Sequence, residues 1–235
     1  MTNSEHTSKQ FDAELEAVRA RVLHMGGLVE EQIKLALDAL ISGDMELCTK
    51  VENNDHLVNG LEVGIDEDCS TIIARRQPAA GDLRMLMTVV KTITDLERIG
   101  DEAAKIARMA KLIYSADRLQ QPRTVEVRRM SQIALEMLRK SLDAFARLDL
   151  AASAEVVRQD QRVDEEFRGV LRQLITFMME DPRTISVSIE ILFIAKAIER
   201  IGDHAKNISE YVIYMVKGKD VRHVTLEEIE REVMG

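Results

Sequence analysis

One pentapeptide occurs twice in this sequence and constrains the possible folds more than any other feature. Glu-Arg-Ile-Gly-Asp stands at residues 97–101 and returns unchanged at residues 199–203. A second acidic pattern precedes each copy: residues 55–59 carry Asp-x-x-Val-Asn, and residues 160–164 carry Asp-x-x-Val-Asp. Because both patterns recur a little over 100 residues apart, we interpret the chain as a duplication of one whole structural unit.

Apolar residues recur with a period close to 3.6 through six long segments, which is typical of amphipathic helices. The expected helices are residues 11–42, 44–76, 82–116, 123–148, 149–180 and 184–217. The three prolines, Pro78, Pro122 and Pro182, lie at the boundaries of these segments. Aromatic residues make up only 3% of the chain, so Leu, Ile, Val, Ala and Met must fill the core. This composition favours helix packing over a sheet.

We therefore predict an all-α fold of two tandem three-helix bundles with a short C-terminal helix. Thr225 and Glu228 form a capping-box pattern that would begin this last helix. The expected organisation is a disordered tail at 1–9, a first repeat at 10–118, a second repeat at 122–218, and a C-terminal tail with its short helix at 219–235.

The net charge of −9 disfavours binding to nucleic acid or to an anionic membrane surface. The N-terminal residues are polar and do not resemble a secretion signal, and no apolar run approaches the roughly 18 residues that span a bilayer. Cys48 and Cys69 fall on one expected helix roughly 30 Å apart, beyond the reach of a disulfide. We expect a cytoplasmic protein without direct membrane insertion.

The repeated acidic residues are spaced so that pairs of carboxylates share one side of a helix. Glu97 and Asp101 are four residues apart, as are Glu199 and Asp203. Like charges at this spacing oppose helix formation by a few tenths of a kcal/mol. Because the arrangement occurs twice in matching places, we infer that some compensating interaction offsets the repulsion.

Two such helices can supply four oxygen-bearing side chains to one ion. Oxygen ligands suit hard cations such as Mg²⁺, Ca²⁺, Mn²⁺ or oxidised iron. An equally open interpretation is a solvated acidic face with Arg98 and Arg200 as local partners. Gly100 and Gly202, in the middle of the expected helices, allow close approach either of a ligand or of a neighbouring helix.

We expect no catalytic activity from this chain. The five histidines do not form a catalytic or zinc-binding set, and no Glu-x-x-His motif for a ferritin-like di-metal centre is present. The sequence also lacks a Gly-rich phosphate loop and a nucleophile elbow.

The duplicated motif, together with the run Arg-Gln-Pro at 76–78 and Asp-Leu-Arg at 82–84, resembles the PhoU family of phosphate-transport accessory regulators. The resemblance extends from about Phe11 to Gly218. It implies two similar three-helix bundles side by side and metal binding on the acidic motifs. It also implies a non-enzymatic negative regulator of the phosphate-starvation response. The implied partners are the ATP-binding subunit of the phosphate ABC transporter and the sensor histidine kinase PhoR, and family analogy suggests a homodimer.

The resemblance also implies which residues bind metal. In the second repeat these are Asp160, Asp164, Glu199, Asp203 and Asn207. In the first repeat they are Asp55, Asn59, Glu97 and Asp101. Asn59 replaces an aspartate, and Lys105 stands where the second repeat has Asn207 and could pair with Asp101. We therefore expect the second repeat to retain more metal. Iron, manganese and magnesium all remain candidates.

Two other functions are compatible with the sequence. A phosphohydrolase could use a carboxylate-bound di-metal centre, although no His or Lys general acid or base is evident near the acidic pairs. A purely structural helical scaffold is the other alternative.

Overall fold

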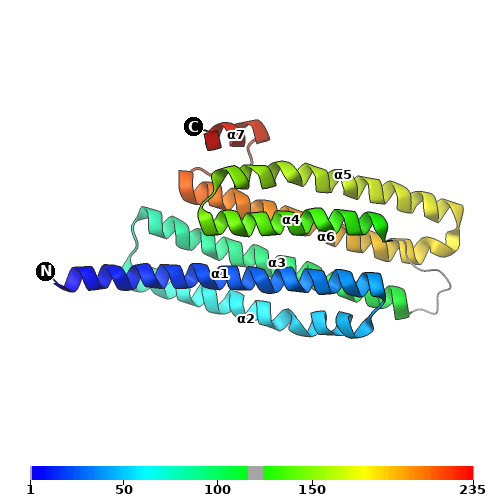
Figure 1. Cartoon of the computed structure of the whole chain (residues 1–235), viewed down its shortest axis with the longest axis horizontal. Helices are drawn as coiled ribbons and strands as arrows, with labels where there is room; N and C mark the ends of the chain where they lie inside the picture. The colour runs from blue at the N-terminus through cyan, green and yellow to red at the C-terminus, as the bar shows by residue number, and fades with distance from the viewer. Residues whose placement is uncertain (1, 116–123, 235) are drawn as a thin grey trace.

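The structure is a computed structural model that describes residues 2–115 and 124–234, and these residues form helices without any strand. The helices are α1 (Thr2–Ser42), α2 (Met45–Arg76), α3 (Ala80–Ser115), α4 (Val125–Arg147), α5 (Leu150–Glu180), α6 (Ile185–Lys217) and α7 (Leu226–Met234), with a 3₁₀ turn at Pro182–Thr184 (Figure 1). The predicted all-α fold of two tandem three-helix units is confirmed.

The first helix begins earlier than the sequence predicted. The helix α1 already begins at Thr2, so the tail that we expected to be disordered over residues 1–9 is helical from its second residue. The expected end of the third helix at residue 116 and start of the fourth at residue 123 lie outside the described residues.

Local side-chain chemistry explains why several helices begin and end where they do. Asp44 caps α2, its carboxylate accepting hydrogen bonds from the backbone N–H groups of Glu46 and Leu47 at 2.8 and 3.1 Å. The expected capping box of α7 is present, because the Thr225 N–H donates to the Glu228 carboxylate at 2.9 Å. Gly218 directly follows the last residue of α6 and ends this helix. It adopts φ +75, the left-handed conformation that glycine tolerates best.

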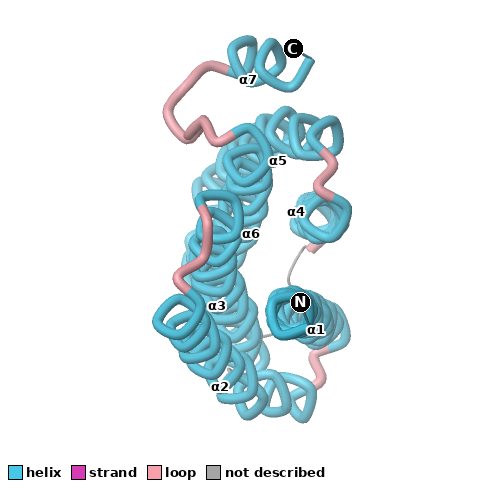
Figure 2. Tube along the Cα trace, turned by 90° about the vertical axis from the view of Figure 1, so that its left-hand side faces the viewer, coloured by secondary structure: helices cyan, strands magenta, loops and turns pink. Residues whose placement is uncertain are grey.

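The two repeats combine into one layered molecule. Seen along the helices in Figure 2, α3 and α6 lie side by side in the centre, with α2 beyond α3 and α5 beyond α6. The helices α1 and α4 pack on one side of this four-helix layer, and α7 lies beyond α5. The contact between α3 and α6 is the most extensive between any two helices. The two repeats are therefore joined mainly through their third helices.

The apolar residues of both repeats form one continuous core that extends from α1 to α6. Fully buried members include Val22, Ile65 and Phe145. A smaller cluster, including Ile213 and Ile229, holds α7 against α5 and α6. Such burial of Leu, Ile, Val and Met side chains contributes about 1.5–3 kcal/mol each.

Two further expectations concern cysteines and membranes. Cys48 and Cys69 are both free and buried on α2, as their spacing predicted. Burial raises the pKa of the Cys69 thiol to about 12, which keeps it protonated and unreactive.

Among the described residues, no helix combines the length and the apolar character that crossing a bilayer demands.

Candidate functional site

The duplicated glycines bring the acidic helices of each repeat close together. A Cβ on Gly100 would lie 3.4 Å from Val58 Cγ1, and one on Gly202 would lie 3.4 Å from Val163 Cγ1. Each valine belongs to the acidic pattern of the preceding helix. The glycines therefore allow a close contact between neighbouring helices, which was one of the two interpretations of the sequence. This contact places the carboxylates of α2 beside those of α3, and the carboxylates of α5 beside those of α6.

We call the carboxylates and the amide at the contact of α2 and α3 the first acidic face. Its members are Asp55, Asn59, Glu62, Glu97 and Asp101. Burial, followed by the negative charges of Asp101 and Glu62, raises the pKa of Glu97 above its ordinary value. Side chains from both helices are therefore close enough to interact electrostatically.

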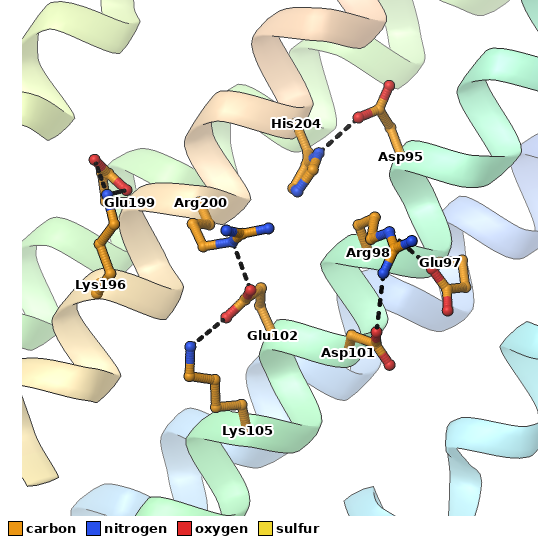
Figure 3. Close-up of polar contacts among 10 residues, drawn as sticks. All are labelled: Asp95, Glu97, Arg98, Asp101, Glu102, Lys105, Lys196, Glu199, Arg200 and His204. Carbon is orange, nitrogen blue, oxygen red and sulfur yellow. Dashed lines mark hydrogen bonds and ion pairs between the residues drawn. The ribbon is translucent and has the colours of Figure 1, made fainter.

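Two oxygens of the first acidic face have no hydrogen-bond partner among the described residues. Asp55 Oδ1 and Asn59 Oδ1 are buried and unpartnered, while Asn59 Nδ2 donates a long hydrogen bond of 3.4 Å to Asp55 Oδ2. The Arg98 guanidinium lies 3.6 Å from the Glu97 carboxylate and 3.9 Å from that of Asp101 (Figure 3), beyond good hydrogen-bond distance. A local arginine thus compensates this face only weakly.

Lys105 does not form the pair with Asp101 that its position in the sequence allowed. Its Nζ instead lies 3.3 Å from Glu102 Oε2. Glu102 is buried between α3 and α6, and its Oε1 also forms an ion pair with Arg200 Nε at 2.6 Å (Figure 3). A carboxylate buried at a helix contact attracts the lysine more strongly than the half-exposed Asp101 does.

We call Asp160, Asp164, Glu199 and Asp203, at the contact of α5 and α6, the second acidic face. Burial, followed by the charges of Glu199 and Asp160, raises the pKa of Asp203 to about 6. Two lysines on α6 lie within this face. Lys206 Nζ donates to Asp160 Oδ2 at 2.8 Å, and Lys196 Nζ donates to both Glu199 oxygens at 2.6 and 2.5 Å.

Asn207 does not join the other expected ligands of the second repeat. Its Nδ2 donates to Asp95 Oδ1 on α3 at 3.1 Å, and His204 Nδ1 contacts the same oxygen at 2.6 Å (Figure 3). Burial and the Asp95 carboxylate also raise the pKa of Tyr211. Asp95 is therefore the acceptor of a polar cluster that links the two repeats, and the fifth ligand inferred from the resemblance belongs to this cluster.

Sequence reasoning missed Asp95, Lys196 and Lys206. Both lysines were visible: they lie close to the second pentapeptide, and an alignment of the two repeats places Thr94 and Ala104 opposite them. The expectation that no His or Lys general acid or base lies near the acidic pairs is therefore wrong as to position, because both lysines are hydrogen-bonded to acidic residues of the second face. Asp95 carried no such signal, because its partners come from the other repeat.

The residues of the acidic faces suit a hard cation in their chemistry, but they are not gathered around one point. Carboxylate and amide oxygens are the ligands of such ions, and buried oxygens without partners are uncommon in native proteins. In the part of the chain that the structure describes, no group of three or more His, Cys, Asp or Glu side chains is arranged to hold a metal ion. Binding would require side chains of neighbouring helices to turn toward one another.

Comparison with known proteins relates the geometry to a family. The family model described as "PhoU domain" matches twice, over residues 22–110 and 127–212, one match for each repeat. This chain belongs to the PhoU family. The two matches cover the acidic patterns on α2, α3, α5 and α6.

Curated members of the PhoU family align with nearly the whole chain. The phosphate-specific transport system accessory protein PhoU homolog of Pseudomonas putida is 49% identical over 98% of this chain and 90% of its own length. The phosphate-specific transport system accessory protein PhoU of Escherichia coli K12 is 46% identical over 99% of this chain and 95% of its own length.

Solved PhoU structures have the same fold. The crystal structure of PhoU from Pseudomonas aeruginosa matches with a TM-score of 0.85 and 48% identity, covering 89% of this chain and 100% of that one. The phosphate transport system regulatory protein PhoU of Streptococcus pneumoniae matches with a TM-score of 0.83 at 29% identity, covering 90% and 99%.

Proposed function

We propose that this protein is a cytoplasmic negative regulator of phosphate uptake and of the phosphate-starvation two-component response. In this role it acts as an adaptor between the ATP-binding subunit of the phosphate ABC transporter and the sensor histidine kinase PhoR, and it works as a homodimer. The observation that carries the proposal is the identity of 46–49%, over almost the whole chain, to proteins named as accessory proteins of the phosphate-specific transport system.

The described residues support an adaptor more than an enzyme. The acidic faces are held by helix packing, and the lysine that lies nearest to Asp160 is already hydrogen-bonded to it at 2.8 Å. A lysine paired in this way is a poor general acid or base, because transfer of its proton would break a charge-assisted hydrogen bond. The relatives are likewise named for an accessory role and not for a reaction.

We propose further that the acidic faces bind a hard cation such as iron, manganese or magnesium. The candidate ligands are Asp55, Asn59, Glu97 and Asp101 in the first repeat and Asp160, Asp164, Glu199 and Asp203 in the second. The support is their oxygen chemistry and the raised pKa values of Glu97 and Asp203, which reflect burial first and the negative charge of neighbouring carboxylates second. A bound cation would relieve this repulsion and hold neighbouring helices together, but it supplies no reaction step.

A deletion strain tests the regulatory role. We expect loss of the gene to raise phosphate-starvation gene expression in phosphate-rich medium, because the negative regulator would be missing. Expression is measured with a reporter fused to a phosphate-starvation promoter, and phosphate uptake is measured in parallel. The gene on a plasmid should restore repression. Normal repression and normal uptake in the deletion strain would contradict the proposal.

A further inference from the structure

We infer that the two acidic faces of this protein have diverged: the first is open to a hard cation, whereas the second is largely neutralised by its own lysines. This inference rests on the metal-binding part of the proposed function. It also reverses the order of the two sites that Asn59 and Lys105 indicated in the sequence.

The second acidic face contains built-in cations. Lys206 is hydrogen-bonded to Asp160, and Lys196 is hydrogen-bonded to Glu199 through both carboxylate oxygens. Asp160 is only 6% exposed, so its carboxylate is largely shielded from water, while the Lys206 side chain that pairs with it is 34% exposed. A metal ion that used Asp160 or Glu199 would first have to displace a lysine, which weakens its binding.

Among the residues that the structure describes, no lysine is bonded to the first acidic face in this way. Thr94 and Ala104 occupy the positions that correspond to Lys196 and Lys206, and Lys105 is directed to Glu102. The remaining cation, Arg98, stays 3.6 and 3.9 Å from Glu97 and Asp101. Four carboxylates, including Glu62, are therefore present without a closely bonded cation from the described part of the chain.

Three buried acceptor oxygens beside the first acidic face have no partner among the described residues. Two belong to Asp55 and Asn59. The third is Oε1 of Gln32 on α1, a side chain only 4% exposed, which lies 3.4 Å from the position that a Cβ on Gly100 would take. Buried oxygens of this kind are normally bonded to a donor, a water or an ion.

The buried glutamine of the second repeat does not serve the same purpose. Gln159 is 6% exposed, with an unpartnered Oε1, but its side chain interacts with Glu136 on α4. Asp164 and Asp203 have no ion-pair partner among the described residues, so the second face retains some affinity for cations. The two faces therefore differ in how tightly they bind a cation, and not in whether they can bind one.

Mn²⁺ titration of metal-free protein, followed by calorimetry and by the EPR signal of free Mn²⁺, tests the order of the two faces. Glu97→Gln with Asp101→Asn should weaken the tightest Mn²⁺ binding about tenfold or more, which corresponds to loss of charge-assisted contacts. Glu199→Gln with Asp203→Asn, the matched variant of the second repeat, should weaken it less than about threefold.

Exchange of the equivalent residues provides the sharper test. Lys196→Thr with Lys206→Ala gives the second face the residues of the first, and should strengthen Mn²⁺ binding there about tenfold. One half of the reciprocal change, Thr94→Lys, adds a cation three residues before Glu97 at an exposed position and should weaken binding to the first face. Circular dichroism melting curves establish that each variant is folded.

The results distinguish a wrong order of the two faces from an absence of metal binding. If neutralising the second face weakens Mn²⁺ binding more than neutralising the first, or if the lysine exchanges change nothing, the divergence is wrong while metal binding stands. If neither the wild-type protein nor the Lys196→Thr, Lys206→Ala variant binds Mn²⁺, metal binding itself is wrong and the inference falls with it.

Discussion

Glu210 on α6 shows how burial and an occupied partner together set the state of one side chain. The residue is 5% exposed, and burial raises its pKa to about 7. Lys206 lies nearby and lowers the pKa, but its ammonium group is hydrogen-bonded to Asp160. Because the Lys206 ammonium group is hydrogen-bonded to Asp160, it compensates the charge of Glu210 only in part.

We predict that Glu210→Gln stabilises the protein at pH 8 and not at pH 4.5. The folded-state pKa of about 7 is above the ordinary value of 4.5, so the folded protein holds its proton more tightly. Stability is therefore lost as pH rises from about 4.5 to about 7, by on the order of 3 kcal/mol. Glutamine removes this loss. Thermal melts across this pH range measure it, with the exposed Glu165→Gln as control.

A melting-temperature difference between Glu210→Gln and wild type that does not grow with pH would contradict this account. It would mean that Glu210 is not protonated in the folded protein near neutral pH.

At the scale of helices, the paired glycines of α1 have different roles. A Cβ on Gly26 would lie 2.7 Å from Leu142 Cδ1 on α4, closer than side chains normally approach. Gly27 is exposed, with no atom within 4 Å of an added Cβ. The helix runs unbroken from Thr2 to Ser42 through both. Gly26 therefore permits the close approach of the two repeats, whereas Gly27 only lowers helix propensity.

We predict that Gly27→Ala stabilises the protein by about 0.5–1 kcal/mol, because alanine favours the helix and meets no neighbour. Gly26→Ala should stabilise it less, or destabilise it, because Leu142 must shift. Urea unfolding measures both changes. In a double-mutant cycle, Leu142→Ala should relieve the effect of Gly26→Ala; equal effects of the two glycine substitutions would refute the packing argument.

At the scale of the whole molecule, the two copies of the pentapeptide have separate tasks. Arg200 crosses from the second repeat to Glu102 of the first at 2.6 Å, while Arg98 remains beside its own acidic pair (Figure 3). The residue that corresponds to Glu102 in the second repeat is His204, which offers Arg98 no carboxylate and pairs with Asp95 instead. The duplication is therefore asymmetric where α3 meets α6.

We predict that Mn²⁺ raises the unfolding temperature of the intact protein. A ligand that binds only the folded state stabilises it by about 2.7 kcal/mol at a hundredfold excess over Kd, which corresponds to a rise of several degrees. The Asp55→Asn, Glu97→Gln, Asp101→Asn variant should lose most of this rise. Without metal it should be at least as stable as wild type, because the repulsion is gone; unfolding well below wild type would identify these carboxylates as structural.

The sequence by itself determined the helices, their order and the duplication. Apolar spacing along one helix and a cap such as Asp44 are local properties, so they can be derived without knowing what packs where. The four-residue spacing of Glu97 and Asp101 likewise places both acids on one side of α3, whichever helix packs against it. The family resemblance added the prediction of which helices lie next to each other within each repeat.

The tertiary structure alone decided which partner each polar side chain meets. Asn207 turns to Asp95, Lys105 to Glu102 and Lys206 to Asp160. Except for Lys105, these partners lie on another helix, 46 or more residues away in sequence. Charge attraction acts through space and strengthens with burial, so the choice between competing partners depends on how α3, α5 and α6 pack, which no spacing within one helix contains.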